Sequence, residues 1–201
     1  MKITKDLRLG FPFESEKLGT VLVYSTPITR DTFELYYAEL GAVFKACYGS
    51  DDDGAVHLAL VGPQIAYSAL KSYSQRVKTW DKPGGVQLGL VSEIVRLTSV
   101  SYAETDGSGW KTLPLDLAQK REILNTDEVQ EVLNSLVFFT AACKVAPKPL
   151  AEQMLPVIGE SLGWAYGSMT CTEYLDSWQK LTPDATSEKP SAEQSQSSII
   201  A

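Results

Sequence analysis

The chain has 201 residues, of which 44% are hydrophobic and 21% are charged, a balance typical of globular proteins and not of disordered chains. Its 25 acidic and 18 basic residues give a formal net charge of −7. This charge argues against nucleic acid as a broad electrostatic partner, because phosphate backbones attract basic surfaces.

Residues that carry chemistry are few. Cys47, Cys143 and Cys171 are far apart and form no C-x-x-C pair, so we expect neither a disulfide framework nor a zinc site. His57 is the only histidine, and its apolar surroundings favour a hydrogen-bonded helix residue over a catalytic group. Since no glycine-rich phosphate loop is present either, we expect no metal, no cofactor and no enzymatic activity.

The sequence predicts neither a signal peptide nor a membrane span. The charged N-terminal residues are not followed by an apolar region. The longest apolar stretch, residues 136–142, is far shorter than the ~20 residues that a spanning helix needs. We therefore expect a cytoplasmic protein.

The first quarter of the chain predicts a hairpin and then a helix. Residues 3–25 predict a β-hairpin, because apolar side chains alternate over most of its first strand. Gly10 and Pro12 weaken this strand, so we expect it at a sheet edge or bulged. Residues 30–48 then show helical apolar spacing, with Thr29 placed to cap the helix.

Residues 55–79 predict a helix that contains a proline. Because proline is favoured in a first helical turn, we expect Pro63 to split this segment into a short and a longer piece. In the longer piece Ile65 and Val77 are expected to face inward.

A further helix and a second hairpin follow. Residues 85–98 have the apolar spacing of a helix. Residues 99–113 predict a β-hairpin, because the Asp-Gly pair at residues 106–107 suits turn positions with positive φ. Residues 114–124 form a short helix or a turn.

The clearest helix is residues 126–146. Asn125 and Glu128 have the spacing of a capping box, and the broad apolar face that follows predicts the most buried helix of the chain. Another helix is predicted over residues 150–162, with an interruption near Pro156.

A last helix runs from a second capping-box pattern, Thr170 to Glu173, through Trp178. Beyond it Ser, Pro, Glu and Gln dominate, and such a segment buries too little apolar surface to offset its ordering entropy. We therefore predict one domain, residues 1–180, and a disordered polar tail, residues 181–201. The fold class is mainly α within α+β: a helical domain with an N-terminal hairpin and a second hairpin.

Large aromatic side chains gather in the C-terminal third of the chain. Such residues either anchor interfaces or fill cores. Tyr174 and Trp178 are one helical turn apart, next to the polar tail, and with Trp164 they are our candidate partner-binding residues. The tail is either a link to a partner or a frayed end.

Several segments resemble small proteins of tailed-phage genomes, and together they span most of residues 1–178. The segments are Met1–Leu9 (MKITKDLRL), Val23–Phe33 (VYSTPITRDTF), Gly89–Thr98 (GLVSEIVRLT), Leu136–Thr140 (LVFFT) and Met169–Leu175 (MTCTEYL). On these segments the chain is similar to the tail assembly chaperones of siphophages.

The resemblance implies a helical, non-enzymatic protein in the host cell cytoplasm. Such a chaperone coats the tape measure protein, recruits major tail tube subunits and is absent from the finished virion. Self-association is a further expectation. The alternative is a structural phage tail protein, either a minor tail component or a tail completion component.

Overall fold

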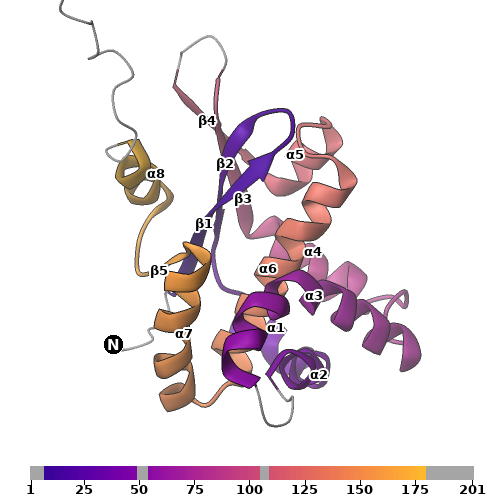
Figure 1. Ribbon diagram of the computed structural model, residues 1–201. Helices are drawn as coiled ribbons and strands as arrows, with labels where there is room; N and C mark the ends of the chain where they lie inside the picture. Colours follow the sequence, from indigo (N-terminus) through magenta and orange to yellow (C-terminus); the bar gives the residue numbers. More distant parts are fainter. Residues whose placement is uncertain (1–6, 49–53, 105–108, 180–201) are drawn as a thin grey trace, which may run out of the picture.

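A five-stranded antiparallel sheet divides the structure, a computed structural model that describes residues 7–48, 54–104 and 109–179 (Figure 1). The strands occur along the sheet in the order β4-β3-β2-β1-β5. Their bounds are β1 Arg8–Ser15, β2 Gly19–Ser25, β3 Thr98–Ala103, β4 Trp110–Pro114 and β5 Ala165–Gly167.

Helices lie on both faces of this sheet, but very unequally. The helix bounds are α1 Arg30–Leu35, α2 Tyr37–Tyr48, α3 Gly54–Arg76, η1 Gln87–Val91, α4 Ser92–Arg96, α5 Leu115–Lys120, α6 Thr126–Val145, α7 Lys148–Leu162 and α8 Cys171–Gln179. The long helix α6 packs against β1, α2 and α3. Figure 1 shows α8 apart from the other helices, on the opposite side of the sheet. The fold is of the α+β class.

We name the face of the sheet that packs against α6 the front face and the face under α8 the back face. The front face carries the main core. Side chains alternate across a strand, so Leu9, Phe11 and Phe13 of β1 point to the same side, where they are buried with α6. On the back face, Leu22 and Tyr24 of β2 form a second, smaller cluster with α8. The front face is the domain core, and the back face is a thin layer.

The two pairs of strands that the sequence predicts are joined into one sheet. β1 pairs with β2 and β3 pairs with β4, while β2 and β3 pair with each other through register positions such as Val23 and Val100. The short strand β5, which sequence analysis missed, pairs with β1 only over Arg8–Gly10. The prediction of an edge or bulged strand is therefore wrong, since β1 lies between β2 and β5. Pro12, which has no N–H to donate, nevertheless lies beyond the three residues that pair with β5.

Local capping signals are confirmed. The Thr29 side chain accepts a hydrogen bond from the Thr32 N–H, as an N-cap does. In α6 the Asn125 side chain accepts from the Glu128 N–H at 2.9 Å, and the Glu128 carboxylate accepts from the Asn125 N–H at 2.7 Å. This reciprocal pair is a capping box.

Two predicted helix breaks are wrong. α3 runs without interruption through Pro63, and α7 runs through Pro156. A proline inside a helix removes one hydrogen bond and costs about 3 kcal/mol, so packing must offset it. In α3 that packing is extensive, because Gly62 lies directly against the Phe138 ring of α6 and the Cys47 thiol of α2 lies 3.9 Å from the Gly62 carbonyl oxygen.

The predicted helix over residues 30–48 is divided at Tyr36, and the one over 85–98 begins as a π-helix. One side chain links these two irregularities. The Tyr36 hydroxyl donates to the Gly84 carbonyl at 2.8 Å. A Cβ atom on Gly89 would lie only 1.6 Å from the Tyr36 hydroxyl oxygen. Only glycine leaves room there for the tyrosine.

Candidate functional site

Trp164, the first predicted partner-binding residue, belongs to the main core. It is 9% exposed, and its ring lies 5.8 Å from Phe11, 5.9 Å from Phe138 and 6.0 Å from Phe139, measured between ring centroids. Aromatic pairs at these distances stabilise a core beyond the area they bury. In this structure Trp164 fills space between the sheet and α6 and does not present a surface to a partner.

Tyr174 and Trp178, the other two predicted residues, lie on the far side of the sheet from Trp164. Tyr174 is 3% exposed, and its ring stacks on Tyr24 with a centroid distance of 6.4 Å. Trp178 is partly buried in the same cluster. The expected exposed aromatic surface is therefore not formed by these residues. Sequence alone could not decide this, because a large aromatic residue fills a core more often than it anchors an interface but suits both.

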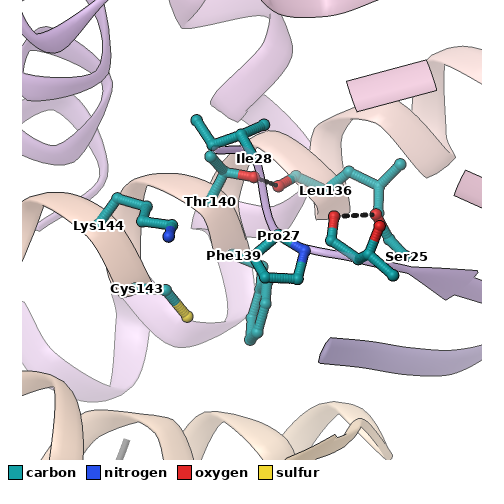
Figure 2. A pocket seen from close by; sticks show the side chains of 9 residues that line it. Ser25, Pro27, Ile28, Leu136, Phe139, Thr140, Cys143 and Lys144 are labelled. Atoms are coloured by element: carbon teal, nitrogen blue, oxygen red, sulfur yellow. Dashed lines mark hydrogen bonds between the residues drawn. The ribbon is translucent and has the colours of Figure 1, made fainter. Parts of the chain in front are cut away.

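A small cavity lies where the end of β2 meets the last turns of α6 (Figure 2). Its volume is about 10 Å³, room for about one water molecule. The residues that line it are Ser25, Thr26, Pro27, Ile28, Leu136, Phe139, Thr140, Cys143 and Lys144.

The cavity holds two titratable side chains, Cys143 and Lys144. Burial lowers the pKa of Lys144 and raises the pKa of the Cys143 thiol well above its ordinary value. The thiolate is the nucleophile of cysteine chemistry, so a raised pKa keeps Cys143 inert. The lowered pKa of Lys144 makes its amine easier to deprotonate, but a volume of about 10 Å³ leaves no room for a ligand larger than a water molecule.

The other candidate groups also stay apart. Within the described residues, no three His, Cys, Asp or Glu side chains converge as metal ligands would. Cys47, Cys143 and Cys171 are unbridged. The position of His57 falls in α3, but its side chain lies outside the described residues.

Exposed apolar side chains on helices form the remaining candidate site, and α7 has two of them. Leu150 is 39% exposed and Val157 is 59% exposed. They are seven residues apart, two helical turns, and so lie on one face of α7, together with the exposed Pro149 and Pro156. Ala151, Leu155 and Ile158 form the opposite, buried stripe. We name the exposed set, Pro149, Leu150, Pro156 and Val157, the α7 outer face.

A second apolar area surrounds Tyr36. Leu35 is 69% exposed and Tyr37 is 58% exposed, and they flank Tyr36 at the junction of α1 and α2. Leu88, 64% exposed, precedes Gly89, the residue that Tyr36 approaches. Ile65 and Val77, which sequence analysis places inside, are also exposed. Helical spacing locates an apolar stripe but does not say whether a neighbouring element covers it.

No helix in the described ranges is long and apolar enough to cross a membrane. In comparisons with known proteins, no family model matches the chain, and no curated protein or solved structure gives a significant match.

Proposed function

We propose that this protein is a non-enzymatic tail assembly chaperone of a phage, which binds the tape measure protein in the host cytoplasm and promotes assembly of the tail tube. The observation that supports this function is the α7 outer face. It places exposed apolar side chains along two turns of one helix, in the C-terminal third of the chain.

The chemistry of this face fits a helical partner. A tape measure protein is a very long helix with apolar stripes, which would aggregate unless they were covered. Two helices that pack side by side bury such stripes against each other, as in helix-in-groove recognition. None of the exposed residues of α7 from Pro149 to Val157 is charged, so the middle of such a contact requires no desolvation of a charge. Charged groups lie at its ends, where Lys148 and Glu160 are exposed.

The rest of the chain supports solubility of the complex. The formal charge of −7 gives coated complexes a common sign and discourages association between them. A chaperone that covers many apolar repeats of its client requires such a surface outside the contact itself.

Co-expression with the tape measure protein of the same genome tests the proposal. We expect the wild-type chain to co-purify with it and to raise its soluble fraction. Leu150→Glu combined with Val157→Glu should abolish both effects, because each substitution places a charge in the apolar contact. Val77→Glu is the matched control, since Val77 is 43% exposed and lies outside α7.

Three results would change the proposal in different ways. If the wild-type chain neither binds nor solubilises the tape measure protein, the chaperone function is wrong. If it does both and the double variant is unaffected, the function stands and the α7 outer face is not its site. Stoichiometric presence of the chain in purified virions would favour the alternative, a structural tail protein.

A further inference from the structure

Among the residues that the structure describes, α8 is the helix that covers the back face of the sheet, and side chains hold it there. Within the described part of the chain, no backbone hydrogen bond joins α8 to another helix or strand. Its apolar residues meet Leu22, Tyr24 and Trp110, in a cluster separate from the main core. Figure 1 shows α8 standing apart from the other helices. The contact of α8 with the sheet therefore rests on this small cluster and not on the main core.

The contact is nevertheless shaped for this particular helix. Tyr174 lies over Gly10, where an added Cβ atom would be 2.9 Å from three atoms of its ring. The Met169 carbonyl, just before α8, accepts a hydrogen bond from the Tyr24 hydroxyl at 2.6 Å and one from the Arg8 guanidinium at 3.0 Å. A hollow in the sheet and two donors thus specify the sequence Met169–Trp178 as the occupant.

When α8 lies on the sheet, one buried polar group lacks a good hydrogen bond. The Tyr174 hydroxyl is buried, and no described group meets it with ordinary hydrogen-bond geometry. The Trp178 side chain approaches it as a weak donor, but Trp178 lies on α8 itself and moves with it. A buried polar group without a good hydrogen bond costs about 1–3 kcal/mol. If α8 leaves the sheet, water can hydrogen-bond to the Tyr174 hydroxyl and this cost is removed. The helix also keeps its cap on opening, since Thr170 and Glu173 hydrogen-bond to each other's backbone N–H groups.

The connection to the rest of the fold is short. Only residues 168–170 separate β5 from α8, and Gly167 at the end of β5 has φ +148°, a conformation that favours glycine. Short connections next to a separable element are where exchange between copies begins, because an identical element from a second chain makes the same contacts.

We propose that the back-face hollow, formed by Gly10, Leu22 and Tyr24, is an exchange site whose second occupant is the α8 helix of another copy of this chain. The exchanged pair buries the same surface as the closed monomer and requires no new interface except at the connecting residues. This self-association does not involve the α7 outer face and is independent of the proposed chaperone function.

A disulfide reporter tests the exchange directly. The Cys171 thiol of α8 lies within hydrogen-bonding reach of the Ser101 hydroxyl on β3, so Ser101→Cys places two thiols together across the contact. In the closed monomer the resulting disulfide is intramolecular. In an exchanged dimer it joins two chains and is seen as a covalent dimer on a non-reducing gel.

The variant is oxidised after incubation in mild denaturant, below the global unfolding transition, either dilute or concentrated. We expect covalent monomer in the dilute sample and a dimer fraction several-fold larger in the concentrated one, with light scattering giving the mass of two chains. Ser101→Cys combined with Cys171→Ser is the control and should give no covalent dimer. A Gly-Ser insertion after Ser168 relaxes the connection and should reduce the dimer fraction several-fold.

Other outcomes overturn the proposal. Intramolecular disulfide at every concentration shows that α8 does not exchange. A dimer by light scattering whose disulfide is intramolecular shows that copies associate through another surface, and loss of that dimer in Leu150→Glu/Val157→Glu would assign it to α7. Failure of the two thiols to react in the dilute, folded variant shows that Cys171 does not reach position 101 in the closed monomer, and this overturns the α8–β3 contact on which the exchange is argued.

Discussion

In the part of the chain that the structure describes, both faces of the sheet are covered by helices, but the front face is covered by several helices and the back face by one. On the front face α6 buries a continuous row of large side chains, including the fully buried Phe138, and is itself enclosed by α2 and α3. On the back face one nine-residue helix provides the cover, with Tyr174 as its central side chain. Because the front-face cluster is much the larger, we expect most of the global stability to come from it and local opening to begin at the back face.

Phe138→Ala should produce the largest effect, a loss of about 3–5 kcal/mol in the free energy of unfolding, as expected when an aromatic side chain leaves a close-packed core. Urea denaturation measures it. Tyr174→Ala is the comparison on the back face and should cost clearly less, because the covering helix can adjust. Equal losses would show that the two faces form one cooperative unit.

Two glycine substitutions compare the faces by added volume. A Cβ atom at Gly62 would lie 2.3 Å from the Phe138 ring, inside a layer of three helices. We expect Gly62→Ala to lose about 1–2 kcal/mol, because overpacking exceeds the ~1 kcal/mol that alanine adds in helix propensity.

Gly10→Ala, which would press on Tyr174, should change global stability less and instead speed hydrogen exchange in α8. Unchanged exchange there would mean that α8 does not move.

The α6 capping box predicts a pH dependence for the front face. Burial alone raises the pKa of Glu128, but hydrogen bonds from the Asn125 and Glu16 N–H groups and the Ser15 hydroxyl outweigh it and lower this pKa. A carboxyl whose pKa is lower in the folded state stabilises above its unfolded pKa, and this contribution is lost as pH falls through the folded value.

Glu128→Gln should therefore be about 1 kcal/mol less stable than wild type near neutral pH, the size of a typical cap, and the gap should close in acid. Denaturation over a pH series measures this gap, and a constant gap would contradict the assignment.

Tyr174→Phe should have a small effect of opposite sign. Removal of a buried hydroxyl without an ordinary hydrogen bond leaves stability unchanged or raises it by up to about 1 kcal/mol. Thermal denaturation, with hydrogen exchange in α8, is the measurement. A clear loss of stability would show that the hydroxyl has a partner when the protein is in solution.

The smallest effect is expected from the C-terminus. Removal of residues 181–201, which follow α8, should leave the Tm within about 1–2 °C, because 1 kcal/mol shifts a domain of this size by roughly 2–4 °C. A much larger drop would show that the apolar pair Ile199–Ile200 packs on the domain and that the back face has a second cover.

Features that depend on near neighbours could be predicted from the residues alone. Thr29 and the Asn125–Glu128 pair set helix starts, since a cap needs only residues two or three positions away. The same holds for α6, whose apolar face is broad enough to be buried wherever it packs.

Only the tertiary structure decided which apolar residues are covered. Trp164 is core and Val157 is surface, although both are large apolar side chains in the C-terminal third. Continuity of α3 through Pro63, the pairing of β2 with β3 and the addition of β5 depend on partners 70 or more residues away, as with Gly62 and Phe138 or Leu9 and Tyr166. Local sequence cannot encode such partners because burial is a property of the assembled surfaces, where packing free energy outweighs the cost of an internal proline.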